Sequence, residues 1–177
     1  MTLEVVPYDP AWPTRFAAER DRIAAALGPL ALRIEHNGST AVPGLAAKPV
    51  IDVQVSVAAL APLAAYGEPL AALGYTHLEH PDDAFCPFFH RPSRWPHTHH
   101  VHVVAAGGDE ERRTLAFRDY LRAHPEALAV YASLKRDLAA RFAGDSFESR
   151  DAYAAAKSAF IEDAIRRALA EGLPRDL

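Results

Sequence analysis

A short polar segment and a nearby carboxylate could together bind a phosphate group and a metal ion. Gly38-Ser39-Thr40 is typical of a turn whose backbone amides and hydroxyl groups surround an anion. Lys48 could add a positive charge to the same anion. Asp52 lies in a run of valine and isoleucine, where a carboxylate must face solvent, a partner or a cation, because burying it unpaired is too costly. These residues predict a phosphate site beside a cation site, although Gly38-Ser39-Thr40 alone could be a plain turn.

A histidine-rich segment supplies a second set of possible metal ligands. His100 and His102 alternate with valines, so in an extended strand both imidazoles point to the same side. Two imidazoles at this spacing could bind zinc or another borderline metal. The alternative is a polar sheet face with hydrogen-bonded neutral histidines, which we favour for His97 and His99 because they lie nearer a turn.

The C-terminal helices could contribute cations and aromatic rings. Three pairs of side chains are one helical turn apart: Arg118 with Arg122, Tyr131 with Lys135, and Tyr153 with Lys157. An aromatic ring and a cation on one helix face suit a nucleobase and its phosphate, and they equally suit an ordinary solvated helix. Lysine is rare, with three lysines among 19 basic residues, so those three could occupy positions that need a compact ammonium group rather than a planar guanidinium: Lys48, Lys135 and Lys157.

The elements that must position these residues are a small sheet and several helices. The clearest strand is 50–57, whose period of two places Asp52 on a polar face opposite a valine and isoleucine face. Further strands are predicted at 30–35, 75–78, 85–90 and 98–104, and helices at 9–28, 58–73 (in two pieces), 109–123, 125–142 and 149–170. Strands that precede an all-helical last third predict an α+β fold: a small mixed β-sheet with flanking helices and a helical C-terminal third.

Composition narrows the class of protein. With 177 residues, 50% of them hydrophobic and 24% charged, the chain is expected to form one compact domain over residues 1–177. A net charge of −4 argues against binding to duplex nucleic acid. Cys86 is the single cysteine and cannot form an internal disulfide, and no stretch is typical of a signal peptide or a membrane span. We expect a cytoplasmic protein without a membrane partner.

Several segments resemble one protein family. The run HNGSTAVPGLAAKPVID over 36–52 looks like the hallmark of the GrpB family. Weaker similarity covers four further places: 8–12, 100–104, 117–125 and the closing Tyr153, Lys157 and Phe160. The resemblance implies a nucleotidyltransferase-like fold of the polymerase-β type, in which Gly-Ser opens the site and a pair of aspartates follows on the next strand. Members of the family are also found fused to dephospho-coenzyme A kinase in some bacteria.

The sequence departs from that superfamily pattern at the second carboxylate. Gln54 stands where a second aspartate is expected after Asp52, and His100 or His102 occupies the plausible place of a third acid. A two-metal mechanism needs anionic ligands to offset the repulsion between its ions. Either one cation is held by Asp52 and a histidine, as a metal softer than magnesium, or a nucleotide is bound without transfer.

The leading hypothesis is therefore a metal-assisted, nucleotidyltransferase-like protein that binds a nucleoside triphosphate or another phosphorylated small molecule. Its expected residues are Gly38, Ser39, Thr40 and Lys48 for the phosphates, Asp52 with His100 or His102 for Mg²⁺, Mn²⁺ or Zn²⁺, and Arg118, Tyr153 and Lys157 for the far wall. One alternative is a non-catalytic module that binds a nucleotide or an anionic metabolite. Another is a histidine-centred metal hydrolase.

Overall fold

The structure is a computed structural model that describes residues 5–141, 152, 155–175 and 177. Its main elements follow one another along the chain: α1 (Trp12–Leu27), β1 (Arg33–Asn37), β2 (Ile51–Val57), α2 (Ala64–Ala72), β3 (Thr76–Leu78), β4 (Phe88–Arg91), β5 (His99–Ala105), α3 (Asp109–Ala123), α4 (Pro125–Arg141) and α6 (Ser158–Ala170). A short 3-10 helix, η2 (Ser39–Ala41), lies between β1 and β2. No helix in these described ranges is long and apolar enough to cross a membrane.

Five strands form one mixed sheet in the order β1-β2-β5-β4-β3. The β2–β5 pair is parallel, and the other three pairs are antiparallel. The register places Asp52 between Asn37 of β1 and His100 of β5, and it pairs Gln54 with His102. Residues far apart in the sequence thus meet at one end of β2.

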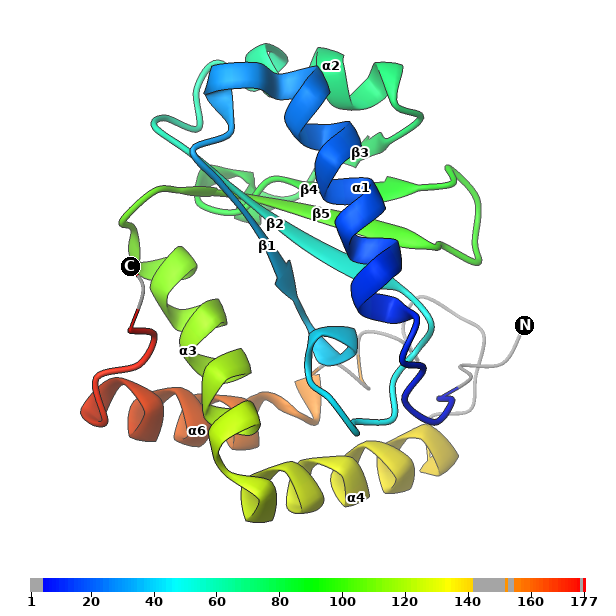
Figure 1. Ribbon diagram of the computed structural model, residues 1–177, viewed down its shortest axis with the longest axis vertical. Coiled ribbons are helices and arrows are strands. Elements are labelled where there is room, and N and C mark those ends of the chain that lie inside the picture. The colour runs from blue at the N-terminus through cyan, green and yellow to red at the C-terminus, as the bar shows by residue number, and fades with distance from the viewer. Residues whose placement is uncertain (1–4, 142–151, 153–154, 176) are drawn as a thin grey trace.

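Helices cover both faces of the sheet. In Figure 1, α1 and α2 lie above the sheet, and α3, α4 and α6 lie below it. The main hydrophobic core lies on the side of α1 and α2, because alternate residues of the central strands point there. Its fully buried members include Trp12, Ile23, Val53, Val55, Leu70, Phe89, Val101 and Val103.

The opposite face of β2 is polar, and α3 packs on it. Gln54 and Ser56 are both completely buried. Glu111 of α3 accepts hydrogen bonds from the Ser56 hydroxyl and the Arg33 guanidinium, and the Gly107 N–H donates to its other oxygen at 2.6 Å. The polar face is therefore an internal hydrogen-bonded layer near Ser56, whereas the Asp52 side chain farther along β2 is 25% exposed.

The α+β class, the mixed sheet and the helical C-terminal part confirm the architecture expected from the sequence. The first strand starts later than predicted because 28–30 forms a 3-10 turn. The two-piece helix over 58–73 is wrong. Pro62 precedes one helix that continues through Pro69, since burial of Tyr66 and Leu70 holds it to the sheet despite the hydrogen bond that proline removes. Of the helix predicted at 149–170, residues 158–170 form α6, and the described residues 156–157 form a turn before it.

Candidate metal and phosphate site

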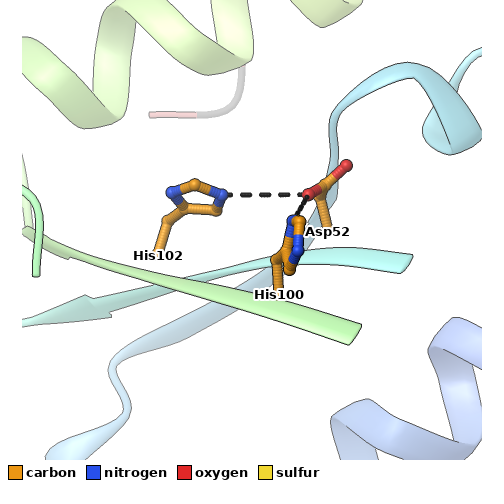
Figure 2. Close-up of side chains that lie close together, drawn as sticks. All are labelled: Asp52, His100 and His102. Carbon is orange, nitrogen blue, oxygen red and sulfur yellow. Dashed lines mark hydrogen bonds and ion pairs between the residues drawn. The ribbon is translucent and has the colours of Figure 1, made fainter. Parts of the chain in front are cut away.

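Asp52, His100 and His102 form a compact cluster on the polar face of the sheet. Figure 2 shows both imidazoles directed at the Asp52 carboxylate. Asp52 Oδ1 lies 3.1 Å from His100 Nδ1 and 3.8 Å from His102 Nε2. The two histidines are two residues apart on β5, beside β2, so the strand period and the parallel register together create this cluster.

The cluster has the donor set of a divalent cation site. One carboxylate oxygen and two imidazole nitrogens lie within 4.8 Å of one another, and all three side chains are half-buried. Imidazole suits zinc and other transition ions, whereas magnesium favours oxygen ligands. These residues therefore fit a single cation of intermediate softness, such as Zn²⁺, better than a pair of magnesium ions.

The electrostatics of the cluster favour an ion pair when no cation is present. Burial acts to raise the pKa of Asp52, but the hydrogen bonds and positive charge of His100 and His102 outweigh it and hold that pKa well below its usual range. Burial opposes the charge on His102, yet contacts with Asp52 and with Cys86, whose Sγ lies 3.9 Å from Nδ1, raise the pKa of His102 to about 10. A cation that binds His102 must therefore displace a proton.

Gly38 allows the chain to approach Asp52 closely. Its φ is +67°, and a Cβ at this position would lie 2.2 Å from Asp52 Oδ2. The Gly38 N–H donates to Asn37 Oδ1 at 2.8 Å and is not available to an anion. Gly38 thus serves the site by making room for the carboxylate.

A cavity of about 730 Å³ opens in front of the cluster. All three lysines of the chain line it: Lys48 from the loop before β2, Lys135 from α4 and Lys157 next to α6. Lys135 is 4% exposed, and its Nζ donates to the Ala46 carbonyl at 2.8 Å. Burial and the charge of Lys157 lower the pKa of Lys135 to about 7, while burial and the charge of Lys48 lower the pKa of Lys157 to about 8. Three amines held together in this way are suited to a ligand with several negative charges.

Another part of the wall of this cavity is largely aromatic and comes from the β4–β5 hairpin, where the Trp95 ring centroid lies 6.0 Å from Lys48 Nζ. Phe88, His90, Trp95 and His97 line it, together with Leu78. His90 and His97 are stacked with their centroids 4.1 Å apart, and the Trp95 ring meets His97 edge-on at 5.1 Å. A flat ring on the ligand would find apolar contact on this wall.

The structure brings most of the predicted site residues to this one cavity. Those that line it are Ser39, Thr40, Lys48, Asp52, His100, His102 and Lys157. The Thr40 hydroxyl is fully engaged, because it donates to Val50 O at 3.2 Å and contacts His36 Nε2 at 3.0 Å. Burial lowers the pKa of His36 to about 4, so this imidazole is neutral. Ser39 is thus the hydroxyl of the predicted turn that is better placed to meet a ligand.

Arg118 is not brought to the cavity. The Arg118 guanidinium donates to Glu35 at 2.7 Å, to His36 O at 3.0 Å and to Asp119 at 2.7 Å, and Arg118 does not line the cavity. It ties α3 to β1, so its predicted place on the far wall is not supported by its position. Tyr153 lies outside the described residues.

Gln54 stands where the superfamily pattern has a second aspartate, and its hydrogen bonds give this amide a structural role. Its Oε1 accepts from Asn37 Nδ2 at 2.9 Å and from the Thr114 hydroxyl at 2.5 Å. The side chain is 0% exposed and joins β1, β2 and α3. Gln54 therefore has a structural position here, and a second cation would lack an anionic ligand from this residue.

Trp95 is not among the residues singled out from the sequence, and Lys135 is singled out there but not placed in the expected site. The scarcity of lysine was a usable signal for Lys135, but nothing local distinguished Trp95 in its hairpin turn. His97 was expected to have a purely structural place, yet it lines the cavity with its Nδ1 3.1 Å from His100 Nε2. His99 faces the other side of the sheet, where its Nδ1 lies 3.1 Å from Arg91.

The fold and the cluster define an α+β protein whose mixed five-stranded sheet holds one carboxylate and two imidazoles on an accessible patch. The chain belongs to the GrpB family, because the family model described as GrpB protein matches residues 2–167. A crystal structure of the conserved protein GrpB from Enterococcus faecalis has a TM-score of 0.83 and 33% identity, and the match covers 95% of this chain and 98% of that chain. This result confirms the resemblance found in the sequence.

Curated relatives agree with that assignment. A UPF0157 protein of Pseudomonas aeruginosa is 41% identical over 95% of this chain and 68% of its own length. A UPF0157 protein of Halalkalibacterium halodurans is 39% identical over 94% of this chain and 83% of its own length. A dephospho-CoA kinase of Mycolicibacterium paratuberculosis is 37% identical over 94% of this chain, which spans 46% of that protein.

Proposed function

We propose that this protein binds a nucleoside triphosphate together with one divalent cation and acts as a nucleotidyltransferase-like protein on an acceptor. The observation that carries the proposal is that the Asp52-His100-His102 cluster and all three lysines line the same cavity. Its volume of about 730 Å³ falls in the usual range for small-molecule sites.

The chain's own residues would divide the work of binding between them. Lys48, Lys135 and Lys157 would neutralise the phosphates, and the Ser39 hydroxyl would donate to a phosphate oxygen. Asp52, His100 and His102 would hold Zn²⁺ or Mn²⁺, which when bound supplies Lewis-acid polarisation of a phosphoryl oxygen.

The hairpin wall of Phe88, Trp95 and His97 would contact the nucleobase. This arrangement orients the triphosphate between the lysines and the aromatic rings. It also keeps the phosphates beside the Asp52 cluster.

A second candidate function is nucleotide or anionic-metabolite binding without transfer, and the position of Gln54 favours it. Transfer by two cations is poorly supported when this residue is a buried amide bonded to Asn37 and Thr114. The similarity to less than half of a dephospho-CoA kinase is consistent with a module that works beside a nucleotide-handling enzyme.

Calorimetry combined with a pyrophosphate-release assay tests the proposal. ATP is titrated into the protein with Mg²⁺, Mn²⁺ or Zn²⁺, and pyrophosphate is measured over a panel of acceptors. We expect saturable ATP binding that needs a cation and that is weakened at least tenfold in Lys135→Met, but not in Arg20→Met, an exposed change on α1. Binding with turnover supports transfer, binding without turnover supports the non-catalytic module, and no binding with any cation contradicts both. A zinc ion that survives dialysis, without nucleotide binding, would favour the histidine-centred hydrolase.

A further inference from the structure

A second cavity of about 350 Å³ lies next to the first and shares Ser39, Asp52, His102 and Lys157 with it. The two cavities differ in charge. Three lysines and one carboxylate line the first, whereas Lys157 is the only lysine among the lining residues of the second, which include the carboxylates Asp52 and Glu110. Phosphates would therefore prefer the first cavity, and the second suits a ligand without negative charge.

A buried donor without a partner lies in the wall of the second cavity. Gln54 lines this cavity, and its Nε2 is buried with no hydrogen-bond partner among the described residues. The neighbouring bonds fix its orientation. The Gly38 N–H donates to Asn37 Oδ1, so Asn37 Nδ2 faces Gln54 and the Gln54 atom that meets it must be Oε1. Turning the Gln54 amide over would set two donors against each other.

Leaving such a donor unpaired destabilises the free protein, so an oxygen that reaches it recovers part of this cost. No described residue pairs with Nε2, so a hydroxyl oxygen placed against this wall of the cavity would give the donor its partner. Phe117, Tyr131, Ile161 and Ile165 also line the cavity, and their surfaces suit a short carbon skeleton.

We propose that this second cavity binds the acceptor, a small neutral hydroxylated molecule that accepts a hydrogen bond from Gln54 Nε2 and contacts the apolar side chains of α3 and α6. The assignment of this molecule as the acceptor rests on the proposed function, because the cavity meets the triphosphate cavity at Asp52 and His102. Binding in the second cavity is an independent property that can be measured without nucleotide.

The composition of the chain makes the test unusually direct. Asn37 and Gln54 are the only asparagine and the only glutamine, so an ¹⁵N-labelled sample gives two side-chain carboxamide signals. The signal that disappears in Gln54→Met belongs to Gln54. Ile161→Phe narrows the second cavity, and Ile161 does not line the first.

The probe is 1,2-propanediol, titrated into the whole chain while these amide signals are followed. We expect a saturable shift of the Gln54 signal, an affinity at least tenfold lower in Ile161→Phe, and unchanged ATP binding in that variant. The proposal is overturned by the absence of a saturable shift, by an equal affinity in Ile161→Phe, or by acetate binding at Gln54 as tightly as the diol. If Gln54→Met does not fold, Asn37→Asp identifies the remaining signal instead. Failure of ATP to bind would overturn the proposed function, and the diol titration would still decide whether the second cavity is a binding site.

Discussion

Gly38 and Asp52 are in direct contact, with no space between the backbone of one and the carboxylate of the other. A Cβ on Gly38 would lie 2.2 Å from Asp52 Oδ2 and 2.8 Å from its Cγ. The position of the Asp52 carboxylate relative to His100 and His102 thus depends on a residue without a side chain. The glycine of the predicted phosphate turn has its clearest role in the candidate cation site.

Replacing Gly38 tests this role. Gly38→Ala should move the Asp52 carboxylate and weaken Zn²⁺ or Mn²⁺ binding at least tenfold. Gly44→Ala is the matched control, because Gly44 has a φ of +81° but nothing within 4 Å of an added Cβ. Both variants should lose stability because φ is positive, and Gly38→Ala should lose about 1–3 kcal/mol, since its ψ of −169° places it in a region that is essentially restricted to glycine. Equal cation affinities in the two variants, measured by calorimetry, would show that the contact with Asp52 is unimportant.

The buried lysines predict how triphosphate binding depends on pH. Burial and neighbouring positive charge lower the pKa of Lys135 to about 7, so its charged fraction in the free protein falls as the pH rises above 7. Phosphate binding favours the charged amine, and ATP affinity should therefore decrease by roughly tenfold or more from pH 7 to pH 9. Lys135→Arg keeps a charge over this range and should flatten the profile. A wild-type affinity that is constant, or that rises with pH, contradicts this view of Lys135.

Tryptophan fluorescence should report the base end of the ligand. Trp12 is 0% exposed in the core, whereas Trp95 is half-buried in the cavity wall, so Trp95 is the ring that a ligand can reach. ATP should quench the fluorescence of the wild-type protein, and this change should be absent in Trp95→Leu. Since stacking on an aromatic side chain is worth about 1–3 kcal/mol, this variant should bind ATP roughly tenfold more weakly. Inorganic triphosphate should bind both proteins equally, and a loss of its affinity in Trp95→Leu would argue against a base-binding wall.

The sequence predicted the strands that carry Asp52, His100 and His102, because strand period is local and regular. The alternation in 50–57 and 98–104 predicted that Asp52, His100 and His102 lie on polar faces, and the parallel pairing of β2 with β5 brings them together. The positions of Thr40 and Gln54 were less readable. Their side chains are committed to partners on other elements, and no local pattern reveals whether a hydroxyl or amide is already bonded in the fold.

The helical part of the site was the least predictable. Arg118 and Lys135 both belong to one-turn pairs on C-terminal helices, and this spacing does not distinguish them. Tertiary packing distinguishes the two residues. Arg118 donates hydrogen bonds to Glu35 and Asp119, whereas Lys135 lines the cavity and donates a hydrogen bond to Ala46 O. Such long-range placement depends on how α3 and α4 dock on the sheet, which short-range spacing does not encode.

Restoring the second carboxylate should not create a two-cation site. Gln54→Asp shortens a fully buried side chain that bonds Asn37 and Thr114, so it should destabilise the protein by about 1–3 kcal/mol or more. Asn37→Ala removes one of the same bonds, and the double variant should be less destabilised than the sum of the single changes. Thermal unfolding and metal analysis check both points. A second bound cation per chain in Gln54→Asp would contradict the structural position assigned to Gln54.

The central claim is that Asp52, His100 and His102 bind one divalent cation beside the lysines. Its most direct test is calorimetric titration of Zn²⁺ and Mn²⁺ into wild-type protein and Asp52→Asn, an almost isosteric change. We expect one site per chain in the wild type, proton release on binding because the raised pKa of His102 keeps it protonated in the free protein, and an affinity at least tenfold lower in Asp52→Asn. Equal affinity in the two proteins, or no cation binding by the wild type, would contradict it.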